Sequence, residues 1–275
     1  MTILDEIIVG VQEDLRERSA LVSLAEIMKR AEQAPSPLDV MNSFARGNFG
    51  VIAEVKRSSP SKGALAEIPD PATLARSYQE GGACAVSVLT EKRRFNGSLA
   101  DLTAVRSAVT IPILRKEFIV DEYQIFEARA YGADIILLIV AALTDQQIRN
   151  FSELTHQLGM RTLIEVHDGE ELSRILHLME QGKLSVDLIG INARNLKTLA
   201  INPSIFGELV SHMPAHIPLI AESGIGSAAE VGSLASLGAD GVLVGEALVK
   251  DGQPAQAIGE FLNRAQSARV RRLSV

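Results

Sequence analysis

Val51-Ile-Ala-Glu-Val-Lys-Arg-Ser-Ser-Pro-Ser-Lys-Gly63 begins as an apolar strand and continues as a loop rich in serine, proline and glycine. Proline and glycine are typical of turns, so the strand is expected to end near Val55. Because side chains alternate along a strand, Glu54 and Lys56 share one face at its carboxyl end. Such a pair is either a structural ion pair or part of a reactive site, and this segment alone leaves both interpretations open.

The alternation of an apolar strand with a helical segment continues through most of the chain. The eight expected strands are 51–55, 85–89, 111–114, 134–140, 162–166, 188–191, 217–221 and 241–244. Most are short and rich in valine, isoleucine and leucine, which is typical of parallel strands covered on both faces. The helical patterns between them include 70–80, 123–130, 145–158 and 169–181. Eight such units predict an α/β fold, a (β/α)₈ TIM barrel.

Three helix-to-strand junctions repeat one pattern: Gly82-Ala-Cys84, Gly132-Ala-Asp134 and Gly238-Ala-Asp240. The glycine suits a left-handed helix C-cap, so the recurrence supports the division into βα units. A doubly wound open sheet is the competing fold. No Gly-x-Gly-x-x-Gly follows the first strand, so a dinucleotide-binding version of that sheet lacks support.

The segment before the first strand is expected to be a helical extension of the barrel. Apolar residues recur at helical spacing over 3–33, and Pro35 and Pro37 end that run. A second, short helical pattern covers 38–46. We expect the extension to cover one mouth of the barrel. Residues 1–47 would form the extension and residues 48–275 the catalytic barrel, in one structural unit.

Composition limits the class of protein and its partners. Of the 275 residues, 47% are hydrophobic and 22% charged, as in a globular protein with a large core. The net charge of −7 argues against a nucleic-acid partner, and no apolar run approaches membrane-spanning length. The single cysteine, Cys84, excludes an internal disulfide, and the N-terminus lacks the features of a signal peptide. We therefore expect a cytoplasmic protein without a membrane partner.

Polar side chains follow six of the expected strands, at the end where a barrel carries its active site. They belong to the segments Glu54–Lys56, Arg115–Phe118, Glu165–Asp168, Asn192–Asn195, Glu222–Gly226 and Gly245–Ala247. Any one of them could be a solvated rim charge, but six that converge on one mouth favour a shared site. The glycines after the seventh and eighth strands precede helices, which is typical of an amide-lined phosphate pocket. The sequence thus predicts a phosphorylated small-molecule substrate and chemistry carried out by lysines and glutamates.

Six motifs of this chain lie at or near the ends of expected strands, and one of them, Phe95–Ser98, follows the second strand. They are Ile52-Ala-Glu-Val-Lys-Arg-Ser-Ser-Pro-Ser-Lys-Gly63, Phe95-Asn-Gly-Ser98, Leu114-Arg-Lys-Glu-Phe-Ile119, Leu163-Ile-Glu-Val-His-Asp168, Ile189-Gly-Ile-Asn-Ala-Arg-Asn-Leu196 and Ala221-Glu-Ser-Gly-Ile225. Together they resemble the indole-3-glycerol phosphate synthase family, the barrel enzymes of tryptophan biosynthesis. The resemblance implies a carboxy-lyase that closes the ring of 1-(2-carboxyphenylamino)-1-deoxyribulose 5-phosphate, a phosphosugar joined to anthranilate, with loss of carbon dioxide and water. We predict activity without a metal or a cofactor.

The resemblance also implies roles for individual residues. Lys116 would be the general acid, with Lys56 contacting the substrate carboxylate or sharing acid duty. Glu165 would be the acid or base of the dehydration, with Glu54 as a second carboxylate. The other positions implied to bind the substrate are Ser59, Phe95, Phe118, Asn192, Arg194 and Glu222. Those implied to bind its phosphate are Ser223, Gly224, Gly245 and Glu246.

Three further positions, each close in the sequence to a residue with an implied role, carry expectations of their own. Asn195 stands where the family often has aspartate, which leaves the support of Arg194 open. Glu117 replaces a common aspartate and is expected to point outward. His167 shares a strand face with Glu165, and we favour a supporting role for it over a catalytic one. The other histidines show no metal-ligand spacing: His156, His177, His212 and His216.

Two other functions stay open on the sequence alone. A different phosphosugar barrel, such as an isomerase of the same pathway, would share the phosphate pocket but needs an acid/base pair and no paired lysines. A barrel that has lost its chemistry would serve as a subunit or scaffold and would show damaged catalytic positions. For the assembly we predict a monomer, with a weak homodimer as the alternative.

Overall fold

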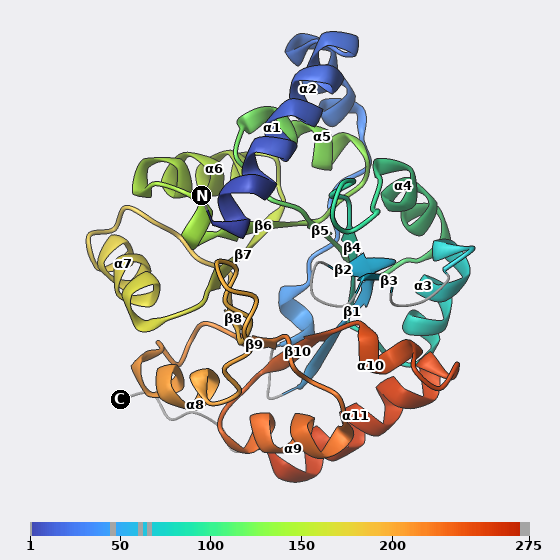
Figure 1. Ribbon diagram of the computed structural model, residues 1–275, viewed down its shortest axis with the longest axis vertical. Coiled ribbons are helices and arrows are strands. Elements are labelled where there is room, and N and C mark those ends of the chain that lie inside the picture. The colour runs from blue at the N-terminus through green and yellow to red at the C-terminus, as the bar shows by residue number, and fades with distance from the viewer. Residues whose placement is uncertain (1, 45–47, 60–62, 65–67, 270–275) are drawn as a thin grey trace.

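The strands close into a parallel barrel. The computed structural model describes residues 2–44, 48–59, 63–64 and 68–269. Around the barrel the strands follow the order β1-β10-β9-β8-β7-β6-β5-β4 (Figure 1). Their bounds are β1 Gly50–Val55, β4 Ala85–Leu89, β5 Ile113–Lys116, β6 Ile135–Ile139, β7 Arg161–Val166, β8 Leu188–Asn192, β9 Leu219–Glu222 and β10 Gly241–Val244. The predicted (β/α)₈ barrel is confirmed, and each expected strand is present with its ends shifted by at most two residues.

Helices surround the barrel on its outer face (Figure 1). Those that follow the strands are α3 Pro71–Glu80, α4 Leu99–Ala108, α5 Glu122–Ala130, α6 Asp145–Gln157, α7 Gly169–Glu180, α8 Ile205–Leu209, α9 Ala228–Ser236, α10 Glu246–Val249 and α11 Pro254–Ala268. The 3₁₀ turns η3 Val140–Ala142 and η4 Val210–His212 precede α6 and follow α8. In the loop after β1, β2 Ser58–Ser59 and β3 Gly63–Ala64 form an antiparallel pair.

Side-chain alternation divides the core into two layers. Val51, Ala53 and Val55 of β1 pack in the cluster between the strands and the helices. Ile52 points inward, where it joins apolar side chains of the other strands in a separate cluster. Glu54 follows Ile52 on the same inner face, nearer the carboxyl end. The barrel interior therefore changes from apolar to charged toward the end at which the strands finish, and that end carries the site.

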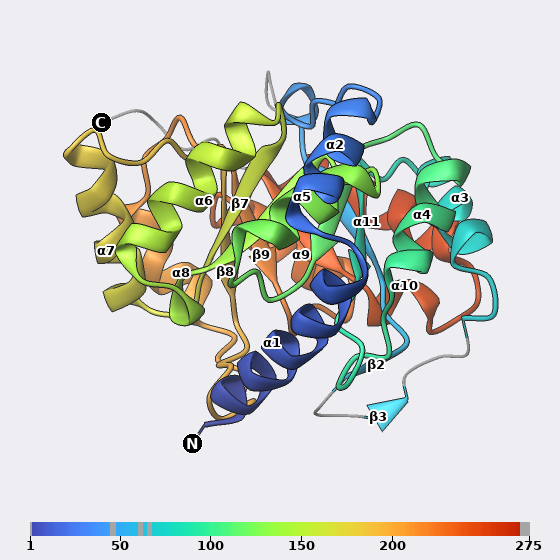
Figure 2. The ribbon, with the colours of Figure 1, turned by 90° about the horizontal axis from the view of Figure 1, so that it is seen from above.

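The N-terminal extension contacts both ends of the barrel. Instead of one helix over 3–33, the chain forms α1 Ile3–Leu21 and α2 Leu24–Gln33, because the Ser23 hydroxyl accepts the N–H of Glu26 and begins a new helix. Figure 2 shows α1 running toward the N-terminus on the side where β2 and β3 lie. At the opposite end, where β1 and β10 begin, the ring of Phe44 lies so close to Gly50 that a Cβ there would be 2.4 Å from it.

Two expectations for the extension are thereby corrected. It does not cover a single mouth, since α1 lies at the carboxyl ends of the strands and Phe44 at their amino ends. The helical pattern expected over 38–46 is only the 3₁₀ turn η1 Met41–Ser43, and residues 45–47 lie outside the described part. The short segment buries Val40 and Phe44 at this end of the barrel.

Three aspartates tie the amino ends of neighbouring strands together. Asp134, Asp187 and Asp240 are equally spaced in the sequence, and each directly precedes a strand, namely β6, β8 and β10. Each carboxylate accepts a backbone N–H from the start of the preceding strand, at 2.8 Å from Ile113, 2.9 Å from Thr162 and 3.0 Å from Leu219. Each also pairs with an arginine, namely Arg106, Arg161 and Arg269. These three aspartates, of which Asp134 and Asp240 belong to the repeated junctions of the sequence, thus join neighbouring strands at the face opposite the site.

The glycines of those junctions adopt the expected conformation. Gly82, Gly132 and Gly238 have φ values of 92°, 89° and 104°, in the left-handed region that glycine favours. At the first junction Cys84 takes the place of the aspartate, and its thiol donates to the carbonyl of Val51 at 3.3 Å.

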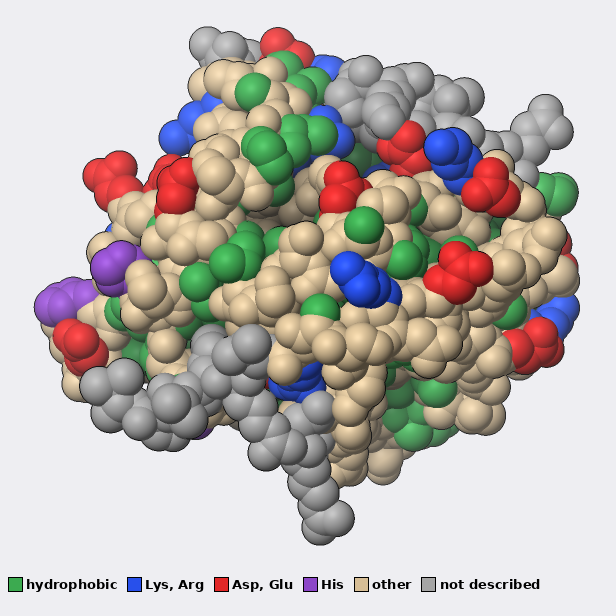
Figure 3. All heavy atoms as spheres, turned by 90° about the horizontal axis from the view of Figure 1, so that it is seen from below, with side chains coloured by type: hydrophobic (Ala, Val, Ile, Leu, Met, Phe, Trp, Pro, Cys, Tyr) green, Lys and Arg blue, Asp and Glu red, His purple; other side chains and the backbone are tan. Residues whose placement is uncertain are grey.

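Among the described residues, no helix is long and apolar enough to cross a membrane. The face seen in Figure 3 carries acidic and basic side chains interspersed among uncharged atoms.

Candidate active site

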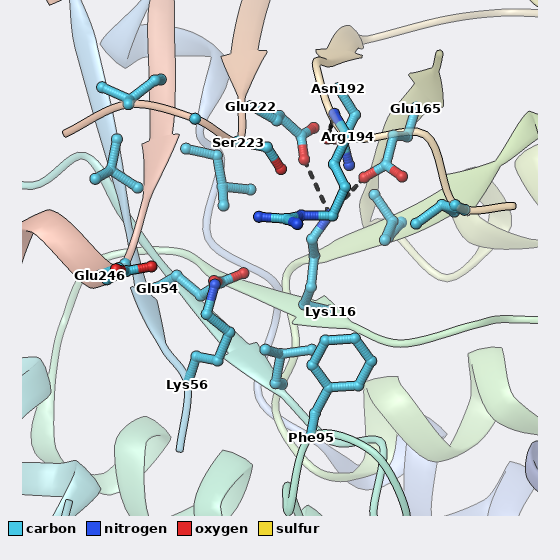
Figure 4. Close-up of a pocket in the computed structure, with 18 of the residues that line it drawn as sticks. Glu54, Lys56, Phe95, Lys116, Glu165, Asn192, Arg194, Glu222, Ser223 and Glu246 are labelled. Atoms are coloured by element: carbon cyan, nitrogen blue, oxygen red, sulfur yellow. Dashed lines mark hydrogen bonds and ion pairs between the residues drawn. The ribbon is translucent and has the colours of Figure 1, made fainter. Parts of the chain in front are cut away.

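A cavity of about 430 Å³ opens at the carboxyl ends of the strands (Figure 4). Thirteen of the fourteen residues predicted for the site line it: Glu54, Lys56, Phe95, Lys116, Phe118, Glu165, Asn192, Arg194, Glu222, Ser223, Gly224, Gly245 and Glu246. The side chain of Ser59, the remaining predicted residue, lies outside the described part. Closure of the barrel brings these residues together from strands that are far apart in the sequence.

Lys116 lies between two buried carboxylates. Its ammonium donates to Glu165 Oε2 at 2.5 Å and to Glu222 Oε2 at 2.9 Å, as the dashed lines in Figure 4 mark. The three side chains come from the ends of β5, β7 and β9. Burial by itself lowers the pKa of Lys116, but the carboxylates of Glu165, Glu222 and Glu54 outweigh it and raise the pKa above its usual value. The ammonium is therefore charged at neutral pH.

The two carboxylates differ in the charge they carry. Burial raises the pKa of Glu165, but Lys116 and His167 more than offset it and hold the pKa well below its ordinary range. For Glu222, burial is only partly offset by Lys116, and repulsion from Glu165 adds to it, so the pKa rises to about 8. The surroundings therefore favour the ionised form of Glu165 and the protonated form of Glu222. One member of the pair can accept a proton while the other can donate one.

The second lysine belongs to a separate ion pair. Lys56 Nζ lies 2.7 Å from Glu54 Oε1, beside Glu246 in Figure 4. Gly245 passes so close that a Cβ on it would be 3.0 Å from the same Glu54 oxygen. Glu54 and Lys56 thus form an ion pair, and both residues also line the cavity.

One wall of the cavity is aromatic. The rings of Phe95 and Phe118 lie with their centroids 6.2 Å apart and their planes tilted by 37°. Glu91 holds the loop that carries Phe95, since its carboxylate accepts the N–H of Arg94 at 2.7 Å and of Phe95 at 2.9 Å. Ile7 of α1 also lines the cavity. A flat apolar group can stack against such a wall.

The turn after β9 has an unusual backbone. Ser223 and Gly224 are consecutive residues with positive φ, 66° and 72°. Left-handed residues in a turn direct successive N–H groups toward a common point, which favours an anion. The N–H of Gly226 is occupied, because it donates to Glu230 Oε2 at 2.7 Å. On the other side of the pocket, α10 begins directly after Gly245.

Asn195 shapes the loop that carries Arg194. Its side-chain oxygen accepts the N–H groups of Lys197 and Thr198 at 2.9 and 3.1 Å. The turn so closed presents the carbonyl of Leu199, which accepts a hydrogen bond from the Arg194 guanidinium at 3.3 Å. An aspartate oxygen could accept the same two N–H groups, so the departure from aspartate at Asn195 preserves the support of Arg194.

The expectation that Glu117 points outward is wrong. Its side chain is only 4% exposed and accepts hydrogen bonds from the Thr90 hydroxyl at 2.7 Å and the Phe118 N–H at 2.9 Å. The reason is Arg115, which is fully buried and lies 3.7 Å from Glu117. A buried guanidinium requires nearby carboxylates, and Glu117 and Glu127 supply them.

Two residues that the sequence analysis left without a role in the chemistry contact the charged cluster. His167 lies beside Glu165, as its shared strand face indicated. Gly190 of β8 makes room for Glu222, because a Cβ there would lie 2.1 Å from Glu222 Oε1. The available signal for Gly190 is a glycine in the middle of a strand, which indicates close approach of another group.

Comparison with known proteins agrees with this geometry. A sequence model of the family described as indole-3-glycerol phosphate synthase matches residues 4–261. The chain belongs to the indole-3-glycerol phosphate synthase family. An indole-3-glycerol phosphate synthase of Mycolicibacterium gilvum is 53% identical over 261 residues, 95% of this chain and 94% of that protein. One of Paenarthrobacter aurescens is 53% identical over 266 residues, 95% of this chain and 96% of that protein.

The barrel fold also occurs outside the indole-3-glycerol phosphate synthase family. A solved structure of a thiamine phosphate pyrophosphorylase from Pyrococcus furiosus superimposes with a TM-score of 0.58, over 84% of this chain and 99% of that one. Its sequence is 15% identical, so the likeness concerns the fold alone.

Proposed function

We propose that this chain is a carboxy-lyase of tryptophan biosynthesis, converting 1-(2-carboxyphenylamino)-1-deoxyribulose 5-phosphate into indole-3-glycerol phosphate. Membership of the family and the names of relatives that match along nearly their whole length support this activity. The observation that carries the mechanism is Lys116 held between Glu165 and Glu222 in the cavity beside the aromatic wall. Neither an isomerase nor a scaffold requires a second lysine at this mouth.

Ring closure joins the aromatic carbon that bears the carboxylate to the keto carbon of the sugar. The keto oxygen becomes an oxyanion, and Lys116 protonates it. Loss of carbon dioxide then returns the electron pair of the broken C–C bond to the ring and restores its aromaticity. In the last step the new hydroxyl takes up a proton within the cavity and leaves as water, while a carbon-bound proton is removed, so that the two proton transfers balance. The ionised Glu165 takes that proton, with Glu54 as the second carboxylate.

The remaining cavity residues would bind and orient the substrate. Lys56 contacts the substrate carboxylate, which competes with the carboxylate of Glu54 for the Lys56 ammonium. Glu222 holds Lys116, and the residues that contact the ring and the sugar are Ser59, Phe95, Phe118, Asn192 and Arg194. The backbone N–H groups of Ser223, Gly224, Gly245 and Glu246 bind the phosphate, and the left-handed turn at Ser223 and Gly224 supports this assignment. The Glu246 side chain does not oppose the phosphate if it turns away.

Incubation of the purified protein with the carboxyphenylamino substrate tests the proposal, with the appearance of indole fluorescence as the signal. We expect turnover that EDTA does not reduce. Lys116→Ala should abolish product formation, because the oxyanion loses its proton donor. An inactive wild-type chain would favour the scaffold, and isomerisation of a phosphosugar without indole would favour the isomerase. Product formation that depends on a metal would contradict a mechanism run by lysines and glutamates alone.

We further propose that the extension, residues 1–47, and the barrel, residues 48–275, form one structural unit. We also propose that the protein works as a monomer. Leu4, Ile7 and Val11 of α1 pack in the same apolar cluster as the inner face of the barrel, which supports this unit. Sedimentation equilibrium tests the assembly. A mass of one chain, 29.6 kDa, is expected. A concentration-dependent increase toward twice that mass would favour the weak homodimer.

A further inference from the structure

His167 lies between two carboxylates, next to the cavity residue Glu165 and not itself among the residues that line the cavity. Its Nε2 is 3.1 Å from Glu165 Oε1, and its Nδ1 is 3.1 Å from Glu171 Oε2. The contact with Glu165 is an ion pair by distance and is not aligned as a hydrogen bond. Glu171 also accepts the backbone N–H of His167 at 2.9 Å, which fixes the ring relative to the start of α7. The imidazole is buried, with a side chain 3% exposed.

The arrangement makes the two carboxylates around Lys116 unequal. Glu165 and Glu222 both contact its ammonium and are both buried, 1% and 2% exposed. Glu165 has a second cation available on its other oxygen, the imidazolium of His167. The other oxygen of Glu222, Oε1, is buried without a hydrogen-bond partner among the described residues. A proton shared by the pair is therefore most stable on Glu222.

We propose that His167 is a positioning residue that acts as a fixed cation, directing the negative charge to Glu165 and leaving Glu222 protonated, with Glu171 as its counter-ion. This rests on the proposed function, in which Glu165 must be ionised to take a proton. His167 acts through Glu165 and not by contacting the substrate.

The electrostatics agree with this geometry. Burial alone lowers the pKa of His167, but the contacts with Glu165 and Glu171 outweigh it and raise the pKa to about 10. The charged groups around the imidazole are Glu165 on β7 and Glu171 on α7, with Lys116 and Glu222 beyond Glu165. Without Glu171 the imidazole would face one carboxylate fewer, and its charged form would be less stable.

NMR of the protein labelled with ¹⁵N-histidine tests the charge directly and needs no activity. Only five histidines contribute signals, and His167→Gln assigns the relevant one. We expect its two nitrogens to stay protonated to at least about pH 8, and Glu171→Gln to lower the titration midpoint by about one unit or more. A His167 that titrates at its ordinary value, or one indifferent to Glu171→Gln, would overturn the proposal.

The pH profile of turnover tests the effect on Glu165. In His167→Gln the acid limb of kcat should move to higher pH by about 1–3 units, because Glu165 loses a neighbouring cation. KM should change less than kcat, and His167→Lys should restore part of the shift by returning a charge. His156→Gln is the matched control, since His156 is also paired with a carboxylate, Asp187 at 2.6 Å, outside the cavity.

These experiments distinguish a failure of the role assigned to His167 from an absence of synthase activity. An unchanged acid limb in His167→Gln, with a folded protein and the wild-type kcat, would show that the imidazole is merely structural. If His167→Gln does not fold, the same displacement is expected, smaller, in Glu171→Gln, and its absence there would overturn the proposal. A wild-type chain that makes no product would refute the synthase activity, whereas the NMR titration would still decide the charge of His167.

Discussion

Replacement of Gly190 by alanine should reduce turnover far more than stability. The Cβ of Gly190→Ala would lie 2.1 Å from Oε1 of Glu222, 3.1 Å from its Cδ and 3.4 Å from Cδ1 of Leu163. The first distance is incompatible with van der Waals contact, so the Glu222 carboxylate must move by about 1 Å or more, and a misplacement of that size can cost about 10²-fold in rate. Its contact with Lys116, now 2.9 Å, would break or lengthen.

The stability cost of Gly190→Ala should be small for a core position. The displaced atom is the far end of a long side chain that can rotate, so we expect about 1 kcal/mol, the low end of the cost of overpacking. Steady-state indole fluorescence gives kcat and KM, and thermal unfolding gives the stability. A variant that unfolds at the wild-type temperature and turns over at the wild-type rate would refute the role of Gly190.

Two further variants show whether the loss comes from Glu222. Gly259→Ala is the matched control, because Gly259 lies in α11 and, apart from its own stretch of helix backbone, no atom of the described residues lies within 4 Å of its Cβ position. It should leave activity unchanged and stabilise the protein by about 0.5–1 kcal/mol. Glu222→Asp withdraws the carboxylate by one methylene, so its effect should be smaller in the Gly190→Ala background than alone. Strictly additive effects would mean that the two positions do not interact.

Two other predictions concern pH and stability. Glu222→Gln keeps the shape of the protonated side chain but cannot titrate. The stability of the wild type should fall as the pH rises from about 4.5 to 8, by roughly 1.4 kcal/mol per pH unit at most from Glu222, and this contribution should be missing in the variant. Urea unfolding at several pH values measures it, and an unchanged pH slope would contradict the protonated state. Asp187→Asn should cost about 1–3 kcal/mol at pH 7, because the bonds of Asp187 to His156 and Thr162 hold its pKa low against the opposing effect of burial. That cost should fade as the pH falls below about 4 and the wild-type carboxylate takes up its proton, and a constant difference at all pH values would speak against it.

Much of the fold and of the candidate site is predictable because it depends on local pattern. Valine- and isoleucine-rich runs bounded by turn residues mark the strands, and the left-handed glycines mark the ends of helices. Once eight βα units are recognised, barrel closure places every strand end at one mouth, so Lys116 and Glu165 could be assigned to one cavity without coordinates. The break between α1 and α2 was missed because Ser23 interrupts a run whose apolar spacing continues past it.

What the sequence determines by itself is thus the order of the elements and which face of each strand a side chain occupies. The tertiary structure decides which charges meet. Glu117 is buried beside Arg115, whose guanidinium needs a counter-ion, and His167 lies next to Glu165. Alternation along a strand is a property of neighbouring residues, whereas a pKa depends on burial and on charges that other strands bring within a few ångströms. Those distances exist only after the barrel has closed.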